Sequence, residues 1–176
     1  MNKVIKYLFA LFCLCPLLVY SDGVNSAPNV KNARWAFIMK FIPYISWPDV
    51  KKGDEISVCV VGKNPFDGVS DNFESSSKTG VVTVTKLYES IPEVSVLTQC
   101  RVIYFSQSVS RAQLSFIFSQ LNKDPILTIG DHGAFVKLGG MLQFKQRGKL
   151  LRFSLNKALL SEVDLKIHPA LLRLSL

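Results

Sequence analysis

The chain has 176 residues, and 21 lysines and arginines against 13 aspartates and glutamates give it a formal net charge of +8 at pH 7. This length suits one domain, which excludes both a multidomain chain and a mini-protein that depends on several disulfides. The sequence contains no internal repeat and no low-complexity tract.

The N-terminal segment has the pattern of a secretory signal peptide. Lys3 and Lys6 precede an apolar run from Tyr7 to Tyr20, and polar residues follow it. Pro16 breaks this run, which is too short to cross a bilayer core of ~30 Å comfortably. Ser21 is a small residue, which favours cleavage after it. Cleavage after position 27, or lipidation at a cysteine of the apolar run, fits the sequence less well.

The expected processing divides the chain into a signal peptide (1–21), a flexible N-terminus (22–29) and one mature soluble domain (30–176). Loss of Lys3 and Lys6 lowers the formal charge from +8 to +6. In an exported protein, an acidic protein surface or anionic lipid is a better partner for this charge than nucleic acid. The simpler interpretation is that the charge mainly provides solubility.

Two cysteines remain after the signal peptide is removed, Cys59 and Cys100. An even pair in an oxidising compartment predicts one disulfide. In the chain-entropy model it would stabilise the fold by about 4 kcal/mol. Two separate buried thiols are the alternative, because both residues lie in apolar strand-like contexts.

The first half of the mature chain predicts an apolar helix followed by buried strands. The helix runs from Val30 to about Ile42, because Pro43 cannot continue it. Its circumference is apolar apart from a few basic residues, so it should be buried or shared with a second subunit. The other elements expected here are a strand at 55–62, a short helix from Asn64 toward Glu74, a polar loop at 75–78 and a β-branched strand at 81–85.

The second half alternates strands and helices before ending in a hairpin. An apolar stripe predicts a helix from Arg111 to Asn122, and Asn156 is placed to cap a helix that ends at Val163. Strands are expected at 101–106 and 126–129, a hairpin at 141–145 and 150–154, and a last helix at 167–174. Alternation of this kind predicts a single-domain α/β fold, a three-layer α/β/α sandwich with a mostly parallel sheet and an antiparallel C-terminal hairpin.

Most of the sequence patterns that mark enzymes are missing. It lacks a G-x-S-x-G elbow, a phosphate-binding loop and a dinucleotide fingerprint. The two histidines, His132 and His168, are far apart, and neither belongs to a His or Cys cluster. We therefore expect no catalytic residue, no metal site and no cofactor.

One candidate crevice follows the strand that ends near Ile129. Asp131 lies where the carboxyl edge of a parallel sheet places ligands. Phe135 could form an apolar wall, and glycines would allow a ligand to approach the backbone. The candidate ligand or partner residues are Asp131, His132, Phe135, Gly139, Gly140 and Met141. In the alternative interpretation Asp131 caps a short helix at 133–136, Phe135 fills the core and the glycines form a turn.

The predicted hairpin is basic, with Lys145, Arg147, Lys149 and Arg152. These side chains could dock on an acidic partner surface. The alternative is a solvated turn with no partner.

Several short motifs in a fixed order resemble the YfiR family. They are Trp47-Pro48 after the apolar helix, strands at 58–62 and 100–106, Thr128-Ile129-Gly130-Asp131, Gly139-Gly140-Met141, and Phe153-Ser154-Leu155-Asn156. The resemblance spans roughly residues 30–174.

This resemblance implies a periplasmic, non-catalytic protein that represses a membrane-bound diguanylate cyclase through its periplasmic sensor domain. Cyclic di-GMP and biofilm formation would be its output. The resemblance also implies a homodimer. Two competing hypotheses are a periplasmic small-molecule-binding module that uses the crevice from Asp131 to Met141, and an enzyme of unknown type.

Overall fold

The computed structural model describes residues 30–51, 53–77, 80–121, 123–148, 150–173 and 175. The predicted signal peptide (1–21) and flexible N-terminus (22–29) lie outside the described residues.

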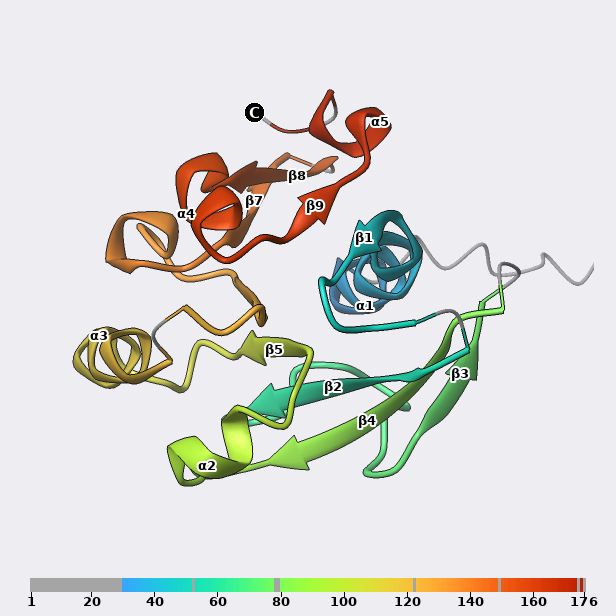
Figure 1. Ribbon diagram of the computed structural model, residues 1–176. Coiled ribbons are helices and arrows are strands. Elements are labelled where there is room, and N and C mark those ends of the chain that lie inside the picture. The colour runs from blue at the N-terminus through green and yellow to red at the C-terminus, as the bar shows by residue number, and fades with distance from the viewer. Residues whose placement is uncertain are drawn as a thin grey trace, which may run out of the picture.

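A seven-stranded mixed sheet forms the centre of the protein (Figure 1), with spatial order β3-β4-β2-β5-β6-β7-β8. Strands β4, β2, β5, β6 and β7 run parallel, while β3 and β8 join the two edges antiparallel. The strands are β2 (Glu55–Val61), β3 (Glu74–Ser76), β4 (Val82–Tyr88), β5 (Val102–Phe105), β6 (Leu127–Gly130), β7 (Leu142–Arg147) and β8 (Leu150–Leu155). The expected α/β fold with a C-terminal antiparallel hairpin is confirmed.

Helices cover both faces of this sheet, because its central strands bury side chains in both directions. One hydrophobic cluster joins the sheet to α1 (Val30–Phe41), the 3₁₀ turn η2 (Ile42–Tyr44), α4 (Lys157–Glu162) and α5 (Pro169–Leu172). A second cluster joins the opposite face to α2 (Val94–Leu97), α3 (Arg111–Gln120) and the turn that leads into the 3₁₀ helix η3 (Val136–Leu138). Strand β2 alternates between them, since Val58 and Val60 enter the first cluster while Cys59 and Val61 enter the second.

Helix α1 packs on the hairpin through aromatic rings. Phe37 lies 5.4 Å from the ring of Phe144 and 5.1 Å from that of Phe153, and Phe41 also contacts Phe153 at 5.7 Å. Each such pair adds about 0.5–1.5 kcal/mol beyond the buried area. The α-helix ends at Phe41 and a 3₁₀ turn contains Pro43, as the missing N–H of proline requires.

The helix predicted from Asn64 toward Glu74 is wrong. The Asn64 side chain accepts a hydrogen bond from the backbone N–H of Phe66 (3.0 Å) and donates one to the carbonyl of Val69 (2.9 Å), which closes a turn. Asn72 adopts a φ of 56°, in the left-handed region. The chain then forms β3, which pairs with β4, so strand pairing replaces the expected helix.

The C-terminal helix is shorter than predicted. Its first expected residue, Ile167, belongs instead to β9 (Lys166–Ile167), which pairs with β1 (Ile45–Ser46) in a separate two-stranded sheet. Helix α5 begins only at Pro169, where the preceding His168 accepts a hydrogen bond from the N–H of Ala170 (3.2 Å). The short β1 strand and helix α2 have no counterpart among the predicted elements.

Candidate functional site

The side of the sheet to which successive parallel strands are added changes between β2 and β5. After β2 the chain adds β4 on one side, and then β5, β6 and β7 on the other side. The loops that follow β2 and β5 therefore diverge, and such a topological switch point leaves a crevice at the carboxyl ends of the strands. A cavity of about 300 Å³ lies there, lined by residues that include Arg34, Lys63, Tyr104, Ser106, Ser108 and Asp131.

Hydrogen bonds join the two loops that border this cavity. The backbone N–H of Lys63 donates to Ser108 Oγ (2.8 Å), and the hydroxyls of Ser106 and Ser108 lie 2.8 Å apart. Gly62, with a φ of +88°, permits this approach, because a Cβ there would overlap both serine hydroxyls. The site is thus preorganised by the local sequence after β2 and β5.

Asp131 follows β6 and forms an ion pair with Arg34 of α1, with 2.8 Å between Oδ2 and Nη1. Gln107 Nε2 donates to the same Oδ2 atom (3.2 Å). The Asp131 side chain is only 4% exposed and that of Arg34 17%. Asp131 Oδ1 and Arg34 Nε are also buried. The pair joins α1 to the sheet edge, and removal of one partner from a buried pair costs about 3–5 kcal/mol.

Tyr104 of β5 completes this polar group. It is fully buried, and its hydroxyl lies beside the side chains of Asp131 and Arg34. Burial raises the pKa of Tyr104 well above its ordinary value, and the negative charge of Asp131 raises it further, while Arg34 acts in the opposite direction. The hydroxyl therefore remains protonated at neutral pH, next to the Asp131 carboxylate.

Neither histidine forms an acid–base pair with Asp131. His132 Nε2 lies 2.8 Å from the carbonyl oxygen of Ser106, which can only accept, so this nitrogen carries the proton. The contact ties the loop after β6 to the loop after β5. His168 lies at the start of α5, and its Nδ1 accepts from a backbone N–H there.

Phe135 fills the core between two glycines. It is fully buried, and a Cβ at Gly130 or Gly140 would overlap its ring. Gly139 has a φ of +111° and packs against Phe118. Gly130 and Gly140 thus leave room for the Phe135 ring. This packing agrees with the alternative interpretation, in which Phe135 fills the core and the glycines form a turn. Asp131 does not cap η3, whose N-cap residue is Phe135 and has no side-chain cap.

Members of the six candidate crevice residues line two different cavities. Asp131 lines the cavity at the switch point. Gly139 and Met141 line another of about 480 Å³, bordered by side chains of α3 and α4. Sequence reasoning missed Arg34, Lys63 and Tyr104, although Arg34 was visible as a charged exception in an apolar helix.

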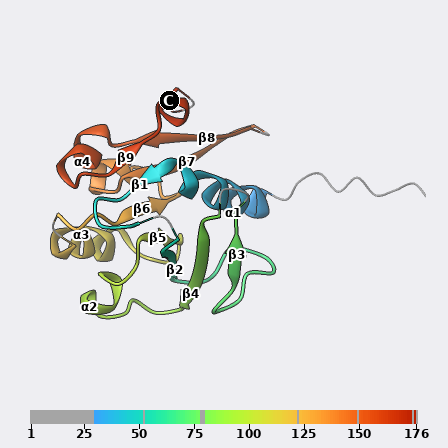
Figure 2. The same ribbon diagram turned by 45° about the vertical axis from the view of Figure 1, so that its right-hand side comes forward.

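The hairpin of β7 and β8 extends toward the upper right in Figure 2. One of its faces is basic. Lys145 is directly opposite Arg152, so these like charges share a face with Arg147, and all three are exposed. Residues on the other face pack on α1. None of the three pairs with a carboxylate of the described residues. The fourth predicted residue, Lys149, lies outside the described residues.

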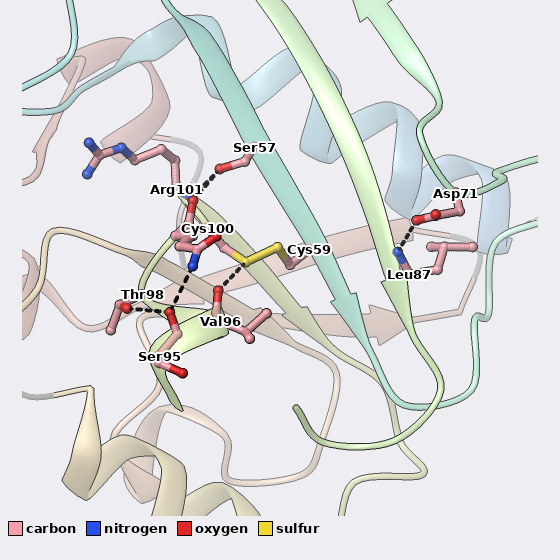
Figure 3. Close-up of a disulfide and its surroundings, with 10 residues drawn as sticks. Ser57, Cys59, Asp71, Leu87, Ser95, Val96, Thr98, Cys100 and Arg101 are labelled. Carbon is pink, nitrogen blue, oxygen red and sulfur yellow. Dashed lines mark hydrogen bonds between the residues drawn. A yellow bond between two sulfur atoms is a disulfide. The ribbon is translucent and has the colours of Figure 1, made fainter. Parts of the chain in front are cut away.

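Cys59 of β2 and Cys100, which precedes β5, form the predicted disulfide (Figure 3). Their Cα atoms lie 6.0 Å apart, and the residues are 0% and 1% exposed. Neighbouring hydrogen bonds hold the same junction, since Arg101 N–H donates to the carbonyl of Ser57 (3.0 Å) and Ser57 Oγ donates to the carbonyl of Gln99 (2.8 Å). The prediction of a disulfide is confirmed.

No three His, Cys, Asp or Glu side chains within the described part of the chain gather closely enough to hold a metal ion. None of the helices described is long and apolar enough to cross a membrane.

The fold and the site together define a single-domain α/β protein with one structural disulfide, a polar crevice at its switch point and a basic hairpin. A family model described as YfiR/HmsC-like matches residues 31–176, and the chain therefore belongs to the YfiR/HmsC-like family. This match confirms the resemblance found in the ordered motifs. The family is a periplasmic one of regulatory, non-catalytic proteins.

Proposed function

We propose that this protein is a periplasmic regulator that binds the sensor domain of a membrane-bound diguanylate cyclase and represses it. The observation that carries this proposal is the YfiR/HmsC-like match, which extends over residues 31–176 and so includes the whole sheet. The Cys59–Cys100 disulfide supports export, because such bonds persist in oxidising compartments. Repression would lower cyclic di-GMP and disfavour biofilm formation.

Repression requires the regulator to distinguish two states of its partner. A ligand that binds both states equally shifts no equilibrium, whereas a shift from 1:99 to 99:1 needs about 5.5 kcal/mol of differential affinity. No reaction has to be catalysed for this. The protein needs only a rigid surface that fits the inactive sensor better than the active one.

The basic face of the hairpin is the surface we assign to this contact. Lys145, Arg147 and Arg152 are exposed, share one face and form no ion pair with a carboxylate of the described residues. Like charges directly opposite one another destabilise a hairpin by a few tenths of a kcal/mol. An acidic sensor surface would relieve this repulsion, and it would also accelerate association through long-range attraction.

We also expect the regulator to act as a homodimer. Light scattering on the purified mature protein measures this directly. A monomer at every accessible concentration would contradict the expectation without affecting the proposed repression.

The proposal is tested by reversing charge on the hairpin. The variant Lys145→Glu/Arg147→Glu should raise cyclic di-GMP toward the level of a gene deletion. Its melting temperature should hardly change, because exposed substitutions usually alter stability by about 0.5 kcal/mol or less. The matched control Lys86→Glu/Lys123→Glu makes the same charge change at two exposed residues elsewhere and should retain repression.

Two results would contradict different parts of the proposal. Full repression by the hairpin variant would remove the hairpin as the docking surface. Equal loss of repression in both variants would show that only net charge matters, so no specific surface could be assigned.

A further inference from the structure

Strand β3 leaves one edge of the central sheet open. It pairs with β4 on one side only, at the lower right of Figure 2. The N–H of Ser77 donates to the carbonyl of Val81 (2.8 Å), and every second residue along an antiparallel pair turns its backbone groups the same way. The N–H and C=O groups of Glu74 and Ser76 therefore point outward, and both residues are exposed. Such an edge is a template for a further strand.

An apolar groove adjoins this edge. It has a volume of about 440 Å³ and is lined by residues 75–77 at the edge and by residues 39, 40 and 42–44 of α1 and η2. Four large hydrophobic side chains of the described chain are exposed, and two of them lie here. Tyr44, which is 48% exposed, lines the groove, and Phe73, which is 36% exposed, directly precedes β3. Exposed apolar surface beside an open strand edge favours binding of an extended segment.

Phe73 lies on the same face of the sheet as the groove. Ser75 pairs with Thr83, whose hydroxyl is 3.6 Å from the sulfur of Met39 on α1. The carbonyl of Phe73 accepts from the N–H of Thr85 (3.0 Å), so the pairing with β4 continues through this residue. Because side chains two residues apart along a strand share a face, Phe73 and Ser75 both lie on the α1 side.

We propose that two copies of this chain pair through β3, antiparallel about a twofold axis at Ser75, and that Phe73 of each copy enters the groove of the other. In this register Glu74 lies opposite Ser76 of the second copy. Each of the two such pairs exchanges two backbone hydrogen bonds. Phe73 lies opposite Ser77 of the second copy, which lines the groove. The groove and the side chain that fills it thus come from the same surface, as a twofold interface requires.

The charges at this edge are compatible with self-pairing. Strand β3 has the sequence Glu-Ser-Ser, without the lysine or proline that blocks many sheet edges. Its one charged side chain, Glu74, lies opposite Ser76 and not opposite the second Glu74, so like charges do not face each other across the pair. Four hydrogen bonds alone would not offset the freedom lost on association. Burial of Phe73 and Tyr44 supplies the apolar contribution.

This pairing gives a surface to the homodimer expected under the proposed function, and it rests on that expectation but not on repression of a cyclase. Strands β3 and β8 are opposite edges of the sheet. Pairing through β3 therefore leaves the basic hairpins free at the two ends of one continuous sheet, where a partner can reach them.

The variant Ser75→Cys tests the position of the axis. Cys59 and Cys100 are joined, so the new thiol is the only free one once the signal peptide is removed. Residue 75 faces its own copy in a non-hydrogen-bonded pair, with Cα atoms about 4.5 Å apart, which a disulfide can bridge. Mild oxidation of the purified mature variant should give a covalent dimer on a non-reducing gel. The control Ser70→Cys, at an exposed residue outside β3, should not cross-link.

Two further variants test the contacts by analytical ultracentrifugation. Ser76→Pro removes an outward N–H and no bond to β4, so it should weaken the dimer while the fold is kept, and Ser76→Ala, which retains the N–H, should dimerise normally. Phe73→Ser should raise the dimer dissociation constant about tenfold or more, because it removes the side chain that fills the groove. Phe116→Ser removes a phenylalanine that is 64% exposed on α3 and should leave the constant unchanged.

The contrary results separate this interface from the proposed function. A wild-type protein that is monomeric at every accessible concentration overturns both the interface and the expected homodimer. A wild-type dimer that persists unchanged in Phe73→Ser, or equal cross-linking of Ser75→Cys and Ser70→Cys, overturns the β3 interface alone. Should Ser76→Pro fail to fold, Phe73→Ser still decides. None of these measurements involves cyclic di-GMP, so failure of the proposed repression would not alter them.

Discussion

Removal of the Cys59–Cys100 disulfide should destabilise the protein by about 4 kcal/mol. The bond closes a loop with a sequence separation of 41 residues, which contains all of β3 and β4. In the chain-entropy model, closure of a loop of this length removes about 13 cal/mol/K from the unfolded chain. For a domain of this size each kcal/mol shifts the melting temperature by about 2–4 °C, so the expected loss is roughly 8–16 °C.

Calorimetric melting of the variant Cys59→Ala/Cys100→Ala beside the wild type measures this loss. Both cysteines are buried, so the wild type must be reduced while unfolded and then refolded in reductant. Reductant should lower the melting temperature of the wild type and leave that of the double variant unchanged. Equal melting temperatures for oxidised and reduced wild type, or two alkylatable thiols in the exported protein, would refute this reasoning.

Three further predictions concern the core, the buried tyrosine and export. Phe135→Ala should lower the free energy of unfolding in denaturant by about 3–5 kcal/mol, because it empties a fully buried site. Gly140→Ala should also destabilise the protein, because its Cβ would overlap the Phe135 ring. Wild-type stability in either variant would contradict this packing. Burial and the Asp131 charge raise the pKa of Tyr104, so the folded state holds this proton more tightly than the unfolded chain. The free energy of unfolding should therefore fall as pH rises above 10.0, and less steeply in Tyr104→Phe; identical slopes would argue against it. Intact-mass measurement of periplasmic protein should show cleavage near Ser21, and a mass that retains the signal peptide would exclude this processing.

Patterns that act within one element predicted most of the fold. Apolar runs located β2, β5 and β6, and Asn156 caps α4 by accepting from the N–H of Leu159 (3.1 Å), as its position before a helix indicated. The order of these elements also predicted a mostly parallel sheet, because short strands that alternate with helices need crossover connections.

Features that depend on distant partners were not predictable in the same way. The segment from Asn64 to Glu74 resembled a helix start, yet pairing with β4 makes its end a strand. The partners of Asp131 illustrate the same limit. Arg34 and Tyr104 lie on elements far from it in sequence, and only the strand order places them beside its carboxylate.

Intracellular cyclic di-GMP in a deletion strain that carries a periplasm-sensing cyclase tests the central claim most directly. Deletion should raise cyclic di-GMP, and a full-length copy should restore the low level. A copy without residues 1–21 should fail to restore it, because the regulator would remain on the wrong side of the membrane. Unchanged cyclic di-GMP on deletion, or restoration by the copy that cannot be exported, would contradict periplasmic repression.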